Sequence, residues 1–301
     1  MQDAVLSNSR DLYRTITEKI VAAIKDSPLT FKMPWHSPGV PAGMPTNAVT
    51  DAPYRGINVL SLWVDALTKD YPSGHWASYR QWQSVGAQVR KGEHGSLIVF
   101  YKRIEGAEGN QNPEDDRPRF FATSSVVFNA AQVEGWTQPL PLRSPEFETD
   151  KQVEAFISAT GATIELGYPA ARYRVDLDRI EMPSPHWFTG TATSAPIQSY
   201  YAILLHELTH WSGASHRLDR TFRNRFGDQA YAMEELTAEL GAAFLCASLG
   251  IANEPRPDNA AYVASWLKVL EADARAIFTA ASRAQQAAEY LSALAASKLG
   301  A

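Results

Sequence analysis

The sequence predicts an α+β protein of two domains, and three observations lead to this fold class. The chain has 301 residues, which is long for one hydrophobic core and suits two domains of roughly 150 residues each. Its first half contains two β-branched and aromatic runs that are typical of strands, whereas its second half is mainly helical with short strands. A proline-rich segment without apolar periodicity, Thr137 to Asp150, separates the halves. We therefore expect a small α+β domain at residues 1–140 and a mainly helical domain with a small sheet at 150–301.

Each element of the first half follows from local patterning. Apolar residues spaced three or four apart predict an amphipathic first helix. The prolines between Pro28 and Pro53 exclude a long regular element there, and the Gly-, Asn-, Asp- and Glu-rich residues 105–119 indicate a loop between two strands. The expected elements are helices at 9–24, 57–67 and 78–85 and strands at 96–102 and 120–128.

The second half is expected to begin with a helix and a small sheet and to continue with helices. We expect a helix at 151–160, strands at 163–166 and 173–182, three helices around Tyr200, Glu235 and Trp266, and a final helix at 274–299. No repeat of fixed period occurs along the chain.

Composition favours a globular protein of the cytoplasm with no membrane partner. Apolar residues make up 45% of the chain and charged residues 20%, and the single cysteine, Cys246, rules out an internal disulfide and fits a reducing compartment. No run approaches the roughly 18 apolar residues that span a bilayer, and the polar N-terminus lacks the pattern of a signal peptide. Serine-nucleophile and phosphate-loop motifs are absent from the sequence.

A metal site is predicted by the motif HELTH. It contains His206, Glu207 and His210 and follows an apolar run with helical character. Residues four apart share one face of a helix, so both imidazoles can approach one metal ion, and Glu207 can act as general base for the water that the ion activates. A five-residue pattern also arises by chance on buried helices, and this alternative remains open.

Two residues are candidates for the third ligand. His216 completes the longer pattern H-E-x-x-H-x-x-G-x-x-H, in which Gly213 turns the chain. Glu235 stands in a run so apolar that an uncompensated carboxylate would be costly, and this consideration favours it over His216. Glu239, four residues further, would then accept a hydrogen bond from a ligand histidine, and Glu234 would face solvent.

At this point the second half resembles a known family. The stretches HELTHWSGASHRLDR and YAMEELTAELGAAFL are similar to the zincin-like metallopeptidase domain of antirestriction proteins of the ArdC type, which occur on conjugative plasmids. The resemblance implies His206, His210 and Glu235 as ligands of one zinc ion, with another divalent ion such as Mn(II) as the alternative, and Glu207 as the catalytic base. It also implies that the strand within residues 172–188 binds extended peptide. Tyr200, Tyr201 or a histidine is a candidate for stabilising the oxyanion.

The first half carries a pattern that suits nucleic acid. Its residues 1–145 contain 15 lysines and arginines against 14 acidic residues, a balance of +1; since the whole chain carries −5, the remainder carries −6. Aromatic side chains interleaved with cations are what single-strand binders use for stacking and phosphate contacts. The candidates for contact with single-stranded DNA are Trp76, Tyr79, Arg80, Trp82, Arg90, Lys91, Lys102 and Arg103. The alternative is that the aromatic residues form the core of a small domain.

Three further stretches of the first half resemble the same family. The runs PYRGINVLSLW, WASYRQWQSVGAQVRKGEHG and VVFNAAQVEG are similar to its N-terminal domain, which is shared with plasmid primases of the TraC type and is associated with single-stranded DNA. The resemblance implies an antirestriction protein that binds single-stranded DNA, carries a metallopeptidase site and acts on a restriction enzyme or another protein. The alternatives are a DNA-binding antirestriction factor with a structural metal site and an interaction protein with an accidental motif.

Overall fold

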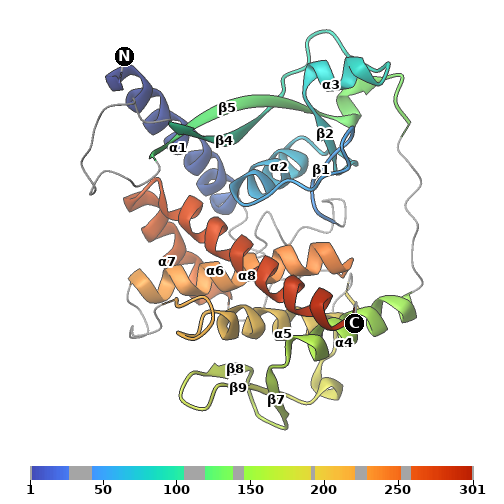
Figure 1. The fold of residues 1–301 in the computed structure, drawn as a ribbon, viewed down its shortest axis with the longest axis vertical. Coiled ribbons are helices and arrows are strands. Elements are labelled where there is room, and N and C mark those ends of the chain that lie inside the picture. Colours follow the sequence, from blue (N-terminus) through green and yellow to red (C-terminus); the bar gives the residue numbers. More distant parts are fainter. Residues whose placement is uncertain are drawn as a thin grey trace.

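A computed structural model describes residues 2–26, 43–104, 119–137, 146–190, 194–220, 229–251 and 259–299, and it confirms the α+β class. Figure 1 shows the sheet of the first half lying across α1 and α2, the C-terminal helices in the middle of the molecule, and the small sheet of the second half at the opposite end. The predicted loop at 105–119 and the boundary at Thr137–Asp150 lie largely outside the described residues.

The first half builds a four-stranded sheet beside three helices. Its elements are α1 (Gln2–Lys25), β1 (Thr46–Asn47), α2 (Ile57–Thr68), β2 (His75–Ala77), α3 (Tyr79–Ser84), β3 (Gln88–Val89), β4 (Ser96–Ile104), β5 (Arg119–Asn129) and β6 (Val133–Glu134). The strand order is β1-β2-β5-β4, with β1 and β2 parallel and the other pairs antiparallel, and β3 pairs separately with β6.

Side-chain hydrogen bonds cap the N-terminus of α3 and pair with the backbone at the edge of β4. Ser78 and Gln81 form a reciprocal capping box that satisfies free N–H groups at the start of α3. The Asn58 amide on α2 donates to the carbonyl of Val99 and accepts from its N–H, so the exposed edge of β4 is paired by a side chain. Gly95 allows the chain to approach β5 closely, because a Cβ there would lie 2.2 Å from Val126 Cγ1.

Where the structure describes it, the second half forms a three-stranded sheet and five helices of more than one turn. Its elements are α4 (Glu146–Thr160), β7 (Thr163–Leu166), β8 (Arg172–Arg174), β9 (Arg179–Met182), α5 (Pro196–Ser212), α6 (Gln229–Leu249), α7 (Asn259–Ala272) and α8 (Ala276–Leu299), with a short 3-10 turn at Pro185–Trp187. The sheet order is β7-β9-β8. The single strand predicted at 173–182 is wrong: β8 and β9 are antiparallel, and a turn with Asp178 at φ 47° separates them.

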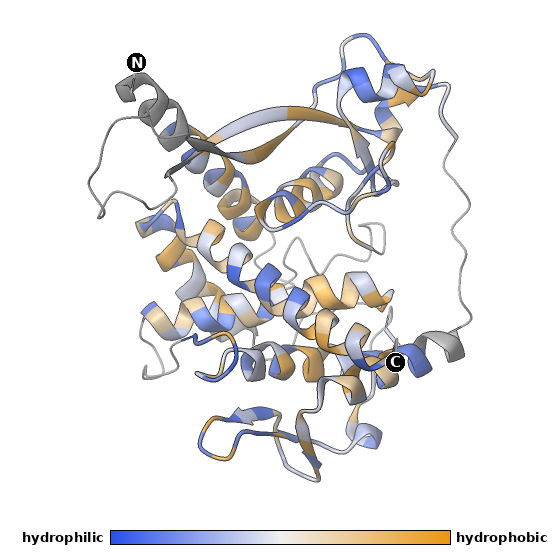
Figure 2. Ribbon diagram, in the orientation of Figure 1, coloured by the Kyte–Doolittle hydropathy of each residue, from blue (hydrophilic) through white to orange (hydrophobic). Residues whose placement is uncertain are grey.

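One hydrophobic core joins the two halves. The buried faces of α1 and α2 pack against α6, α7 and α8, so that Trp63 and Phe244 have ring centroids 5.9 Å apart and Tyr13 and Phe278 only 4.5 Å. Figure 2 shows hydrophobic residues along α2 and the C-terminal helices. Burial of this apolar surface away from water contributes most of the free energy that holds the two halves together. None of the described helices is long and apolar enough to cross a membrane.

Candidate metal centre

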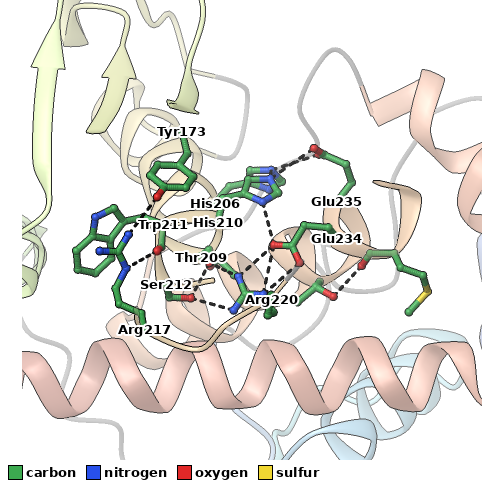
Figure 3. A network of polar contacts seen from close by, with 12 residues as sticks. Tyr173, His206, Thr209, His210, Trp211, Ser212, Arg217, Arg220, Glu234 and Glu235 are labelled. Atoms are coloured by element: carbon green, nitrogen blue, oxygen red, sulfur yellow. Dashed lines mark hydrogen bonds and ion pairs between the residues drawn. The ribbon is translucent and has the colours of Figure 1, made fainter. Parts of the chain in front are cut away.

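The HELTH motif lies on the last two turns of α5. Pro196 occupies the first turn, where its missing N–H costs no hydrogen bond, and the helix ends at Ser212 with Gly213 as its cap. His206 and Glu207 are buried, and His210 follows one turn later, nearly buried as well. The two imidazoles therefore project from the same side of α5, as Figure 3 shows.

Three donor atoms meet above this face of α5. The Nε2 atoms of His206 and His210 are 3.1 Å apart, and each lies 3.5 Å from a carboxylate oxygen of Glu235 on α6. Within the described part of the chain, these three residues form the one group of donors that could hold a metal ion. A tetrahedral ion with bonds of roughly 2.0–2.1 Å separates its ligands by about 3.3 Å, so the donor set fits zinc or a similar divalent ion.

A close crossing of two helices places Glu235 there. At the crossing Gly241 of α6 faces Thr209 of α5, and a Cβ on Gly241 would lie 2.5 Å from Thr209 Cγ2. Only hydrogen fits in this space, so the two backbones approach further than any larger residue would allow. The carboxylates of α6 thereby reach the imidazoles of α5.

The other two glutamates of α6 differ from what the sequence predicts. Glu234 does not face solvent: it is buried, its carboxylate lies 3.1 Å from His210 Nδ1, and it pairs with Arg220. Glu239 is also buried, but its oxygen is 3.6 Å from His206 Nδ1, longer than a hydrogen bond. The glutamate that forms the predicted hydrogen bond with a ligand histidine is therefore Glu234, not Glu239.

The charges of the centre stabilise one another. Burial disfavours the charged form of His210, but the neighbouring carboxylates of Glu235 and Glu234 outweigh it and raise the pKa of His210 to about 10. Burial also opposes ionisation of Glu235, yet His210 and His206 lower the pKa of this carboxyl far below its usual range. The metal-free centre therefore contains an imidazolium beside a carboxylate at neutral pH.

His216 is not part of the donor group. Its side chain is 61% exposed and lies 3.3 Å from Asp178 at the turn between β8 and β9. Gly213 does turn the chain as the longer motif requires, but the turn buries Arg217 and Arg220 instead. Arg217 stacks on Trp211 at 3.8 Å and pairs with Asp178, which ties the small sheet to the end of α5.

The tyrosines near the centre contact other parts of the second half. Tyr201 donates to Glu154 on α4 at 3.0 Å, and the ring of Tyr200 packs against Phe188. Sequence reasoning missed Tyr231, whose hydroxyl is 3.3 Å from that of Tyr262 and whose pKa is raised by burial and by hydrogen bonds with Tyr262 and Glu235. The sequence could have indicated this contact, because Tyr231 stands four residues before Glu235 and therefore on the same face of α6.

Two residues predicted to stack on bases are core residues instead. Trp76 lies on β2 and is 1% exposed, and Trp82 lies on α3 and is fully buried. The indole N–H of Trp82 donates to the carbonyl of Phe128, and the ring of Trp76 packs against Tyr71. The prediction that these two rings stack on bases is wrong, because both side chains point into the core.

The other predicted DNA contacts include exposed groups. Tyr79 is 42% exposed, and Arg80 and Lys91 are exposed as well. Arg90 is exposed, although its guanidinium pairs with Glu93 and donates to the carbonyl of Ala131. Phe100 on β4, 48% exposed, adds an aromatic ring to this set. Lys102 and Arg103 lie on β4, but their side chains are outside the described residues.

Two family models match the chain in succession. Residues 10–128 match the N-terminal domain of anti-restriction factor ArdC, and residues 151–283 match a zincin-like metallopeptidase. The crystal structure of antirestriction protein ArdC from plasmid R388 is similar in its metal-free form, with a TM-score of 0.76 and 39% identity over 95% of this chain and 98% of that one. Its Mn(II)-bound form has a TM-score of 0.74 at 38% identity, with the same coverage.

Two curated relatives add to this picture. The uncharacterized protein y4eC of Sinorhizobium fredii is 46% identical over 288 residues, covering 94% of this chain and 92% of that protein. A DNA primase TraC of Escherichia coli is 34% identical over 302 residues, but the match covers 94% of this chain and only 27% of the primase.

Proposed function

The chain belongs to the ArdC family of antirestriction proteins, and on that premise we propose that it is a metal-dependent peptidase that acts where single-stranded DNA is bound. In this proposal the protein protects incoming plasmid DNA from restriction. The observation that carries the peptidase assignment is the convergence of His206, His210 and Glu235 next to Glu207. Two histidines and a glutamate are a known ligand set of catalytic zinc, which leaves a fourth position for water or substrate.

The three ligands would hold one divalent ion per chain. We expect zinc, and Mn(II), found in the similar ArdC structure, is the alternative. When bound, such an ion supplies Lewis-acid activation of water and of a peptide carbonyl.

Glu207 performs the proton transfers in the proposed reaction. It takes one proton from the attacking water onto its carboxylate and delivers it to the leaving amine, so the peptide C–N bond is exchanged for a C–O bond at the carbonyl carbon. A carboxylate with this role has no function at a purely structural metal site. Its position beside the first ligand histidine therefore supports hydrolysis.

The test of catalysis compares the wild type with Glu207→Gln in the presence of a host-cell lysate and single-stranded DNA. New protein N-termini, mapped by mass spectrometry, are expected with the wild type only, while metal content is equal in both. His216→Ala is the matched control and should cleave as the wild type does. Identical sets of N-termini from the wild type and Glu207→Gln would exclude hydrolysis.

The second candidate is a DNA-binding antirestriction factor with a structural metal site. It is favoured by the low exposure of the centre, in which His206 and Glu207 are buried. A transfer assay into a restricting host distinguishes the two functions. Protection that survives Glu207→Gln but is lost with His206→Ala would favour the structural role.

Single-stranded DNA is the proposed ligand of the first half. Tyr79 and Phe100 offer exposed rings for base stacking, and Arg80 and Lys91 offer exposed charges for phosphates. Trp76 and Trp82 are removed from this role by their burial. Lys102 and Arg103 remain candidates.

Binding of a fluorescent oligonucleotide to the full chain tests this interface. Tyr79→Ala should weaken binding by about 1–3 kcal/mol, the value of one stacked base. Replacing Arg80 or Lys91 by Gln should make the salt slope about 0.7 less steep for each lost phosphate contact. Trp187→Ala, which removes an exposed ring from the second half, is the control and should leave the affinity unchanged. Equal binding by Tyr79→Ala and the wild type would show that bases do not stack there.

A further inference from the structure

A buried chain of three charged or polar groups leads from the end of α5 to the metal centre. The Arg220 guanidinium lies 3.1 Å from both carboxylate oxygens of Glu234, and the same carboxylate lies 3.1 Å from His210 Nδ1. Figure 3 shows the three residues in line, with Glu235 on the far side of the imidazoles. Arg220 and Glu234 are less than one-tenth exposed.

Arg220 also holds the C-terminal turn of α5. One terminal nitrogen donates to the Ser212 hydroxyl at 3.1 Å, and the other donates to the carbonyl of Thr209. The last carbonyls of a helix lack partners within the helix, and a cation there stabilises the end. Because His210 stands in this last turn, the same guanidinium fixes the backbone that carries the ligand and the carboxylate that contacts it.

We propose that Arg220 and Glu234 are positioning residues for His210, a proposal that rests on the metal site proposed above. Glu234 accepts a hydrogen bond from the Nδ1–H of His210, so the proton lost on metal binding is the one on Nε2, and the lone pair left there faces His206 and Glu235. Arg220 holds the Glu234 carboxylate in place through its hydrogen bonds to both carboxylate oxygens. A carboxylate behind a ligand imidazole fixes the orientation of its ring and increases its basicity.

The asymmetry between the two histidines supports this role. His206 lies in the middle of the buried part of α5, and its Nδ1 has no hydrogen-bond partner among the described residues. His210 is in the last turn, where backbone carbonyls lack partners within the helix, and it is the ligand histidine with a hydrogen-bonded carboxylate. The orienting contact therefore occurs where the helix alone holds the ligand least firmly.

Zinc affinity, measured by competition with a chromophoric chelator, tests the proposal on the full chain. Glu234→Gln should weaken zinc binding about 10–100-fold. This change leaves Arg220 buried without its counter-charge, so a double variant, Arg220→Met with Glu234→Leu, is measured beside it. Replacing both members of a buried ion pair by apolar residues is often neutral for stability. The double variant should still unfold cooperatively without metal and bind zinc 10–100-fold more weakly.

Asp178→Asn is the matched control. It breaks another arginine–carboxylate pair at the same end of α5, between Asp178 and Arg217. In the network of Figure 3, Arg217 makes no contact with His206 or His210. It should lower the melting temperature without changing zinc affinity. Wild-type affinity in the double variant would overturn the positioning role.

The ring nitrogens of His210 give a readout that needs no variant. In the zinc-loaded wild type, ¹⁵N NMR should show a protonated Nδ1 in a strong hydrogen bond and a ligated Nε2; the opposite tautomer would overturn the proposal. Failure of the wild type to bind zinc would instead refute the metal site itself, so the two failures are distinguishable.

Discussion

His210 has carboxylates at both ring nitrogens, with Glu234 at Nδ1 and Glu235 at Nε2. The two glutamates therefore have different roles: Glu235 can ligate an ion together with Nε2, whereas Glu234 can only orient the ring. Adjacent residues on a helix point about 100° apart, so Glu234 and Glu235 reach different sides of the same imidazole. The choice between ligand and orienting partner is thus decided at the scale of single side chains.

The first prediction at this scale is that Glu235, and not His216, is the third metal ligand. Glu235→Ala should lower metal affinity at least about 100-fold, since even outer partners of a metal site contribute 10–100-fold. His216→Ala should leave affinity unchanged, because this side chain is exposed and pairs with Asp178. Metal content of the purified variants and titration with zinc provide the measurement. The reverse order of the two effects would assign the longer histidine motif.

Metal binding should also release a proton. With a pKa of about 10, His210 is protonated at pH 7 in the metal-free protein, whereas an ion requires the neutral ring. Glu235 is already ionised, because its pKa is lowered, so it contributes no proton. Apparent affinity should therefore rise about tenfold for each pH unit between 6 and 8. Calorimetry in buffers of different ionisation enthalpy measures the proton, and a release of zero would contradict the charge state.

At the scale of elements, the crossing of α5 and α6 builds the centre. Neither helix carries the complete ligand set, and the small residues at the contact determine how near the two helices lie. Gly241 costs α6 some intrinsic helix stability, about 1 kcal/mol relative to alanine. The close approach to Thr209 explains why a glycine is needed at this position, since a Cβ would collide with the threonine side chain.

Gly241→Ala is the prediction at this scale. Despite its better helix propensity, alanine should destabilise the protein by about 1–3 kcal/mol, because its Cβ forces α5 and α6 apart. The same displacement should weaken metal binding. Thermal unfolding and zinc titration measure both effects. In the double variant with Thr209→Ala much of each loss should be recovered, and additive losses would show that the contact is not the cause.

At the scale of the molecule, the main hydrophobic core contains side chains of both family domains, and two smaller clusters lie within the first half. Helices α1 and α2 of the first half bury their apolar faces against α6, α7 and α8, and Lys25 and Arg55 pair with Glu271 and Glu289 of the second half. The proposed DNA surface and the metal centre therefore belong to one packed body. This arrangement bears on whether residues 1–145 can fold and bind DNA by themselves.

We predict that residues 1–145 alone do not fold as a stable monomer. Separation would expose the faces of α1 and α2 that contain Ile16, Ile20 and Leu60, which are buried in the full chain. Broad NMR signals, dye binding and loss of cooperative unfolding are the expected observations, against sharp unfolding of the full chain. A well-dispersed NMR spectrum of the fragment would show that the first half needs no partner.

Much of the fold was predictable because helix and strand periodicity is local. The ends of α2, β7 and the final helix lie within two residues of the predicted ones, and HELTH alone places two imidazoles one turn apart. The turn within residues 173–182 was missed, since both flanking runs have strand composition. No local signal marked Arg220 as a partner of Glu234.

The sequence by itself determined the main helices and the two long strands, the family and the pair of histidines on one helix face, because each depends on residues close together in the chain. Tertiary structure decided the rest. It brought Glu235 to the histidines, left His216 at the surface, and buried Trp76, Trp82 and Glu234. The physical reason is that burial and the pairing of charges arise from contacts between distant segments, here the crossing of α5 with α6 and the core shared by both halves.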